Sequence, residues 1–166
     1  MEGWFLAFFP SHASADPNVL KGLTGVAVEI LQLSPSVKEH GGSPARLQTD
    51  VELRLRTAGI KVFASSEADR NAGRPTLRVF VMARPLESSD QTEILAFAKF
   101  LFIELHEVAE LSKDRSSNIS IRNATTWRTS FRTGLSKPGA LATDIRKNVA
   151  DLVDEFLNAY LGANQK

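Results

Sequence analysis

Two places in this sequence combine residue types that could carry out catalysis. Glu104 and His106 lie two positions apart, so in a strand they share a face and the carboxylate could orient the imidazole. The His40–Ser43 loop joins a histidine to a glycine pair and a serine, and either place could serve a small hydrolase or a ligand-binding enzyme. A polar strand end and a flexible loop are the plainer interpretations. Because no Gly-x-Ser-x-Gly, Walker or Gly-x-Gly-x-x-Gly pattern accompanies them, we predict no catalytic residue.

The residue types that bind metals and cofactors are scarce and scattered. The 166 residues include no cysteine and three histidines, at positions 12, 40 and 106. Cysteine-ligated metals, disulfides and a lipid attached through cysteine are therefore excluded. Since there is no His-x-x-x-His pair and no aspartate-rich calcium loop, we predict neither a metal site nor a cofactor. Twenty basic and 19 acidic residues give a net charge of +1, which argues against a nucleic-acid partner.

Candidate binding residues come from two expected strands. In 75–85, the apolar residues at 77, 79, 81 and 83 alternate with Arg78, Phe80 and Met82. If helices cover the first set, the second set faces solvent or a partner. In 118–131, Arg122 and Arg128 fall on the face opposite the core face, to which we assign Trp127 and Phe131. These arginines are sheet-surface charge, or they contact an anionic partner such as a polysaccharide, a lipid head group or an acidic protein.

The first 15 residues resemble an export signal more than part of a fold. An apolar run at 4–9 is broken at Pro10, and small residues at 13–15 suit signal peptidase, so the predicted mature chain begins at Asp16. The run is short and Glu2 stands where a basic residue is usual, which would follow if the true start lay upstream. A packed N-terminal arm and an uncleaved anchor are the alternatives. The most apolar later stretch, 94–103, is about half the length of a membrane span.

Hydrophobic periodicity divides residues 16–166, which we take as one domain, into elements. Residues 23–33 and 60–64 are expected strands on either side of a helix over 43–58, which Ser43 caps and Gly59 ends. Such a unit usually connects parallel strands by a right-handed crossover. Residues 37–42 and 133–142 are expected loops.

The segment 92–111 is ambiguous between a helix and a strand. Apolar residues recur at helical spacing along it, with charged residues opposite, but they also alternate as in a strand that is interrupted by Lys99. Its aromatic enrichment and its turn-bounded neighbours favour one long strand.

The final element, 143–161, is an amphipathic helix with Thr143 as its expected N-cap and Gly162 as its expected end. The order of elements is then β-α-β-β-β-β-α. This order predicts an α/β (α+β) two-layer sandwich, in which two helices cover one face of a mixed sheet of about five strands.

Three stretches together resemble an uncharacterised group of small secreted bacterial proteins. They are LQTDVELRLRTAGIKV at 47–62, ATTW at 124–127 and DIRKNVADLVDEFLNAYL at 144–161. The resemblance implies export, a single domain, and strand character for 92–111. The strand–helix–strand opening is more loosely similar to small envelope domains that bind peptides or other envelope proteins.

These observations favour an exported bacterial envelope protein, periplasmic or secreted, that acts as a non-enzymatic binding or accessory module. Its partner would be an envelope protein or an anionic envelope component. The alternatives are the small enzyme described above and a cytosolic interaction protein with a packed N-terminal arm.

Overall fold

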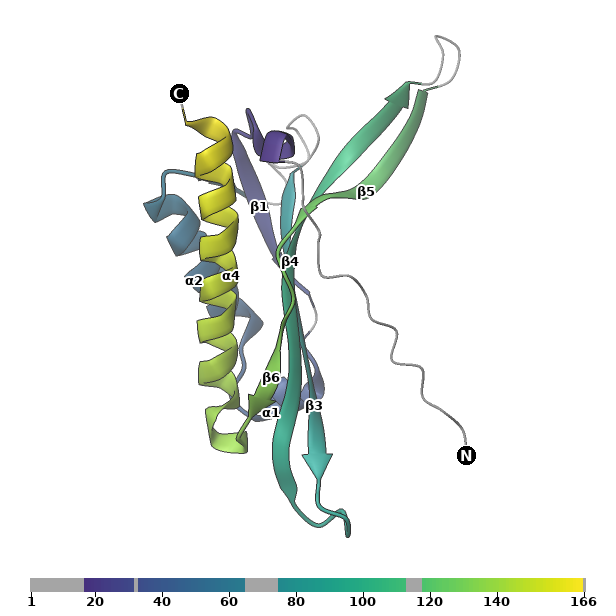
Figure 1. Cartoon of the computed structure of the whole chain (residues 1–166), viewed down its shortest axis with the longest axis vertical. Helices are drawn as coiled ribbons and strands as arrows, with labels where there is room; N and C mark the ends of the chain where they lie inside the picture. Colours follow the sequence, from purple (N-terminus) through teal and green to yellow (C-terminus); the bar gives the residue numbers. More distant parts are fainter. Residues whose placement is uncertain (1–16, 32, 65–74, 113–117, 166) are drawn as a thin grey trace.

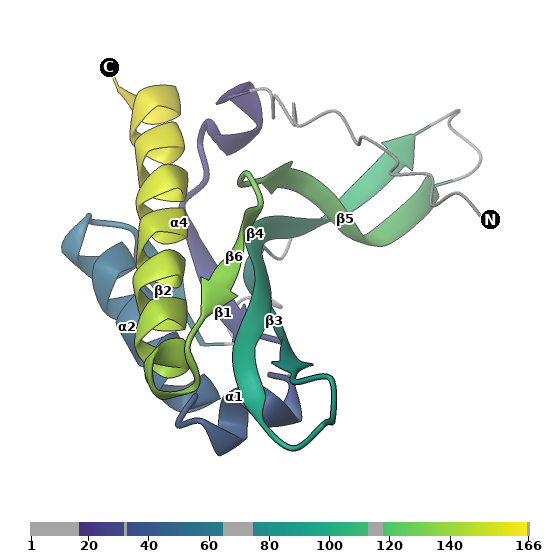
Figure 2. The same cartoon turned by 60° about the horizontal axis from the view of Figure 1, so that its bottom comes forward.

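The protein folds into two layers, with helices on one face of a sheet (Figures 1 and 2). The computed structural model describes residues 17–31, 33–64, 75–112 and 118–165; of residues 17, 109–112 and 118–123 it describes the backbone alone. Helices α2 (Pro44–Thr57) and α4 (Leu141–Asn164) lie side by side over the sheet. A third, short helix α1 (Pro35–Glu39) corrects the prediction of a loop over 37–42, because Pro35 starts a helical turn that buries Val37 in the same core. The predicted α+β sandwich with helices on one face is confirmed. The expected signal at 1–15 lies outside the described residues and stays a prediction.

The sheet is mixed and has six strands. The strands are β1 (Gly25–Ile30), β2 (Lys61–Phe63), β3 (Thr76–Glu87), β4 (Ile94–Ser112), β5 (Asn118–Arg128) and β6 (Arg132–Ser136), and 3-10 turns η1 (Pro17–Leu20) and η2 (Pro138–Ala140) flank the fold. Their order is β2-β1-β3-β4-β5, with β6 also paired to β4. β1 is parallel to β2 and β3, and the other pairs are antiparallel. The parallel β1–β2 pair around α2 agrees with the predicted crossover.

Strand β4 resolves the ambiguity of 92–111 in favour of the strand. It pairs with β3 from Ile94 to His106, and Phe97, Leu101 and Ile103 on its helix-facing side are fully buried. Lys99 lies on the same side, where its Nζ donates a hydrogen bond to Ser136 Oγ over 2.7 Å. The lysine that interrupts the apolar alternation is therefore compatible with a buried strand, because its charged end reaches the sheet edge.

The structure corrects the prediction for 133–142, because a sixth strand forms within the expected loop. Thr129, 1% exposed, donates from its amide to Ile103 O, and its Oγ1 accepts from Ile103 N, each over 2.9 Å. The chain resumes pairing with β4 after this irregularity as β6. The alternation of β5 is broken there. Phe131 therefore lies on the face opposite the core and is 42% exposed, whereas the sequence predicted it on the core face.

Local signals set the ends of α2 but not those of α4. Ser43 Oγ accepts from Arg46 N over 3.3 Å, and Gly59 after the helix has φ +81°, as both residues predict. Helix α4, however, begins at Leu141 rather than after Thr143, because η2 leads directly into it. It also continues past Gly162, since Asn164 Nδ2 donates to Leu20 O over 2.9 Å.

One main core lies between the helices and the sheet. Trp127 is 5% exposed and packs edge-on against Phe156 of α4, with ring centroids 5.2 Å apart, which confirms its predicted core position. The buried stripe of α2 (Leu47, Val51, Leu55) and that of α4 (Ile145, Val149, Leu152, Val153, Phe156) belong to the same cluster. Within the described residues, no helix is both long enough and apolar enough to cross a membrane.

Candidate functional site

The sheet face that points away from the helices carries the side chains that alternate with the core residues. We call it the open face. Its members lie on β1, β3, β4, β5 and β6 and on the segment between β5 and β6. They are Glu29, Arg78, Phe80, Met82, Arg84, Phe100, Phe102, Glu104, His106, Arg128, Phe131 and Leu135. Helices α2 and α4 lie on the other side of the sheet in both views (Figures 1 and 2), and α1 buries Val37 in the same core, so no helix of the described chain covers this face.

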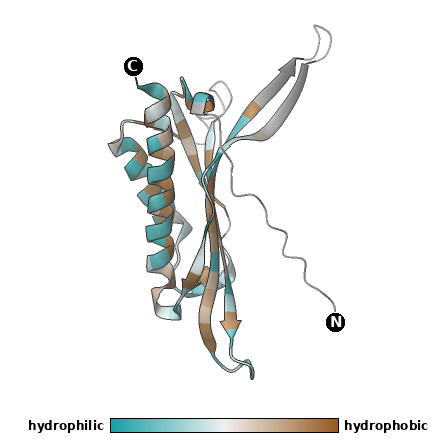
Figure 3. Cartoon of the chain, in the orientation of Figure 1, coloured by the Kyte–Doolittle hydropathy of each residue, from teal (hydrophilic) through white to brown (hydrophobic). Residues whose placement is uncertain are grey.

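Four phenylalanines form one contiguous cluster on the open face. Phe80 stacks on Phe102 with ring centroids 4.2 Å apart, and Phe100 stacks on Phe131 at 4.9 Å. Edge contacts of 5.5 Å between Phe100 and Phe102 and of 5.2 Å between Phe102 and Phe131 join the two pairs. Met82, directly opposite Phe100 on β3, is 56% exposed. Figure 3 shows hydrophobic residues along the part of β4 that pairs with β3. The cluster is an aromatic surface of the kind that binding sites use.

A polar network adjoins the aromatic cluster. Arg78 Nε lies 2.6 Å from Glu29 Oε2, and Arg78 Nη1 lies 3.3 Å from His106 Nδ1. His106 Nε2 is 2.8 Å from Glu104 Oε2, and Arg128 Nη1 is 3.5 Å from the other oxygen of Glu104. A guanidinium only donates hydrogen bonds, so His106 Nδ1 accepts from Arg78 and Nε2 carries the proton that is donated to Glu104. The two glutamates thus hold both arginines in place.

The Glu104–His106 pair forms as the sequence suggests, but its geometry does not make a nucleophile–base relay. Thr125 Oγ1 is the neighbouring hydroxyl, and it lies 3.4 Å from His106 Nε2, the nitrogen that already faces Glu104. A Ser-His-Asp type relay needs the hydroxyl and the carboxylate on opposite ring nitrogens. Here the opposite nitrogen faces Arg78 instead. His106 and Glu104 are each 8% exposed, so the pair acts as a buried polar support for the open face.

The His40–Ser43 loop lies at the end of α1, where its residues have structural roles. His40 Nδ1 donates to Ser36 O over 2.9 Å, and its ring packs edge-on against Phe97 with centroids 4.6 Å apart. A Cβ at Gly42 would lie 2.7 Å from Val37 O, so the close approach there requires glycine. The hollow beside the loop has a volume of about 10 Å³, which is at the lower limit for one water molecule.

The structure brings four of the five predicted binding residues onto the open face. They are Arg78, Phe80, Met82 and Arg128, and the side chain of Arg122 lies outside the described residues. Phe100, Phe102 and Phe131 were not predicted as binding residues. The even-numbered positions of 92–111 could have identified the first two once the strand was accepted, whereas no local signal places Phe131 beside them.

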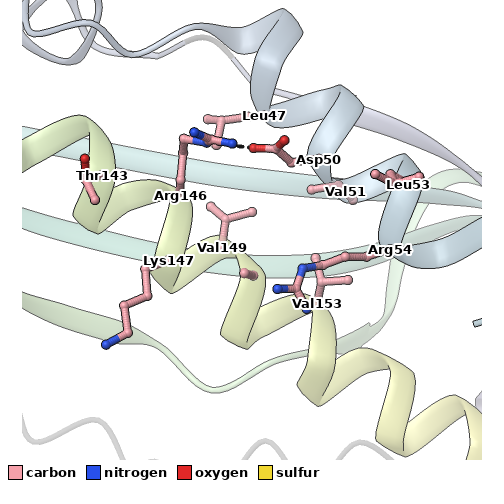
Figure 4. Close-up of a pocket in the computed structure, with 11 residues that line it drawn as sticks. Leu47, Asp50, Val51, Leu53, Arg54, Thr143, Arg146, Lys147, Val149 and Val153 are labelled. Atoms are coloured by element: carbon pink, nitrogen blue, oxygen red, sulfur yellow. Dashed lines mark hydrogen bonds and ion pairs between the residues drawn. The ribbon is translucent and has the colours of Figure 1, made fainter. Parts of the chain in front are cut away.

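A second candidate is the groove between α2 and α4, which has a volume of about 410 Å³ (Figure 4). An ion pair joins Arg146 Nε to Asp50 Oδ2 across it over 2.8 Å, as the dashed line in Figure 4 marks. The lining valines Val51, Val149 and Val153 are at most 2% exposed. A ligand in the groove would therefore meet the exposed Leu53 and the charged side chains of its rim rather than these valines. Among the described residues, no group of three His, Cys, Asp or Glu side chains could hold a metal ion.

Among known proteins, likenesses to this chain are found with solved structures. No protein-family model matches the chain, and no curated protein matches it. A solved structure, that of the rare lipoprotein B from Shewanella oneidensis, is similar over 82% of this chain and 92% of that chain, with 16% sequence identity and a TM-score of 0.30.

Proposed function

We propose that this chain is a non-enzymatic binding or accessory domain of the bacterial envelope, periplasmic or secreted, and that it contacts a protein partner through the open face. The observation that carries this proposal is the cluster of Phe80, Phe100, Phe102 and Phe131 on a sheet face that no described helix covers. Aromatic and Met side chains are enriched at protein interfaces, where they supply apolar contact area.

The charges of the open face favour an apolar protein surface over an anionic polymer or head group. Of the three arginines on the open face, Arg78 and Arg128 each lie beside a glutamate, which reduces their attraction for a further anion, and only Arg84 forms no ion pair within the described residues. Arg128 also lies over the ring of Phe131, 4.8 Å from its centroid. The two paired arginines thus border the aromatic cluster. The enzymatic alternative gains no support from the Glu104–His106 geometry.

Site-specific photo-crosslinking in the native host tests the proposal. With the crosslinker at position 82, we expect a discrete crosslinked species that does not form with the crosslinker at position 53. Leu53 is a matched control, because it is 62% exposed but belongs to α2 on the other layer. Equal crosslinking at both positions, or none at position 82, would contradict the open face as the contact surface.

Phe131→Ser then tests the energetic contribution of the cluster. Loss of an interface anchor typically costs about 2 kcal/mol, or roughly 30-fold in affinity for the purified crosslinked partner. Leu53→Ser should leave that affinity unchanged. Intact-mass analysis of the exported protein tests the localisation separately: a start at Asp16 supports export, and a retained Met1 in a cytosolic fraction contradicts it.

A further inference from the structure

The two edges of the sheet differ in how they are protected. Edge strand β2 is three residues long and contains Lys61, and both properties discourage pairing with another chain. The opposite edge consists of β5 and β6, which pair with successive parts of β4. Of these two, β6 is five residues long and pairs with β4 alone. Within the described chain, no strand pairs with its outer side. It contains no proline, and its one charged residue, Arg132, turns to the helix layer, where Nη2 lies 3.6 Å from Glu155 Oε2.

Apolar side chains flank this unpaired edge on the open face. Leu135 is 65% exposed and lies opposite Ala98 of β4. Phe131, just before β6, is 42% exposed. An edge strand with unpaired main-chain groups beside exposed apolar side chains is a surface that can accept another strand.

We propose that a second copy of this chain pairs with β6 in antiparallel orientation, about a two-fold axis at Gly134. This register pairs the whole strand and sets Arg132 opposite Ser136 of the second copy, and Thr133 opposite Leu135 of the second copy. Opposed residues then point to the same side of the joined sheet, so the two open faces form one continuous surface. No like charges lie directly opposite each other, and Gly134 brings no side chain to the axis.

The size of the contact sets its strength. Five paired residues and the flanking Phe131 bury less than the 1,200–2,000 Å² of a standard interface. A reversible dimer with a dissociation constant on the order of 10 µM is therefore expected. This inference does not depend on the proposed function, because it concerns the purified chain alone.

Cysteine crosslinking tests the two-fold axis directly. The chain contains no cysteine, so Gly134→Cys introduces a single thiol, and a Cβ there meets only Lys99 Cε at 3.8 Å. A short bifunctional maleimide should link two full-length chains at position 134 at least 10-fold faster than at Leu53→Cys, the exposed control on α2. Equal rates at the two positions would overturn the proposed pairing.

Sedimentation equilibrium gives a second, cysteine-free test. We expect the wild-type chain to dimerise reversibly at tens of micromolar, and Leu135→Lys to weaken the dimer at least 10-fold because it places like charges near the axis. Leu53→Lys should dimerise as the wild type does, and circular dichroism should show that all three chains are folded. A wild-type chain that stays monomeric at several hundred micromolar overturns the inference, as does a dimer that Leu135→Lys leaves unchanged.

Discussion

A single buried residue, Thr129, determines how the open face is completed. Its amide and hydroxyl replace the regular ladder at Ile103, and this substitution lets the chain change its alternation between β5 and β6. Phe131 then reaches the rings of Phe100 and Phe102 instead of the core. The aromatic cluster thus depends on one side-chain hydroxyl that lies beneath it.

Thr129→Val should lower the free energy of unfolding by about 1–3 kcal/mol, because it leaves the amide of Ile103 buried without its acceptor. Urea unfolding followed by tryptophan fluorescence measures the change. Thr133→Val, at an exposed position of β6, is the control and should stay within about 0.5 kcal/mol of the wild type. Equal effects of the two substitutions would show that the Thr129 hydroxyl has no special role.

At the scale of elements, β6 and α4 are joined by one polar contact at the start of the helix. Ser136 Oγ donates to Asp144 Oδ2 over 2.6 Å, and Lys99 Nζ lies 3.5 Å from the same oxygen. The hydrogen bond from Ser136, followed by the charge of Lys99, lowers the pKa of Asp144 below its ordinary value. This contact fixes the strand that the structure adds to the sheet against the helix that covers the core.

Asp144→Asn should destabilise the protein near neutral pH by about 1 kcal/mol or less, since the carboxylate is partly exposed. A carboxyl whose pKa is lower in the folded state stabilises above its unfolded pKa, about 3.9, and loses this effect as pH falls through the folded pKa. The difference between wild type and variant should therefore be constant from about pH 7 to 5 and shrink below about pH 4. Thermal unfolding across this range measures it, and Asp151→Asn on the exposed side of α4 is the control. A difference that grows towards low pH would contradict the assignment.

Across the whole molecule, strand β4 runs through two regions that differ in how many neighbouring strands pair with it. Leu101 to Leu105 pairs with β3 on one side and meets β5, β6 or Thr129 on the other. Pairing with β3 ends at His106, so the residues beyond it pair with β5 alone. This two-stranded ribbon projects from the body in Figure 1. Isolated two-stranded ribbons are marginally stable, because they lack a packed face.

Hydrogen exchange should therefore divide β4 near His106. We expect the amides of the projecting ribbon to exchange roughly 100-fold faster or more than those of Leu101–Leu105, because local opening exposes only the ribbon. Exchange measured by mass spectrometry on overlapping peptides gives both rates in one sample. Uniform protection along β4 would mean that the ribbon is held by contacts that the described residues do not include.

Much of the fold is accessible from the sequence because its signals are local. The alternation of 75–85 identifies both faces of β3, and Ser43 and Gly59 mark the ends of α2. The candidate surface is accessible in part: Arg78, Phe80, Met82 and Arg128 follow from strand alternation. Phe100 and Phe102 can be placed on this surface only if 92–111 is a strand, and periodicity alone does not distinguish a strand from a helix there.

The apolar side of each regular element can be predicted from the sequence, because side chains point to the same side at a fixed period. Where that period breaks or continues depends on packing between elements. Thr129 becomes a bridging residue because Ile103 of a distant strand needs partners, and α4 passes Gly162 because Asn164 reaches Leu20. Both outcomes depend on hydrogen bonds between residues far apart in the chain, whose geometry is set by packing and leaves no periodic trace in the sequence.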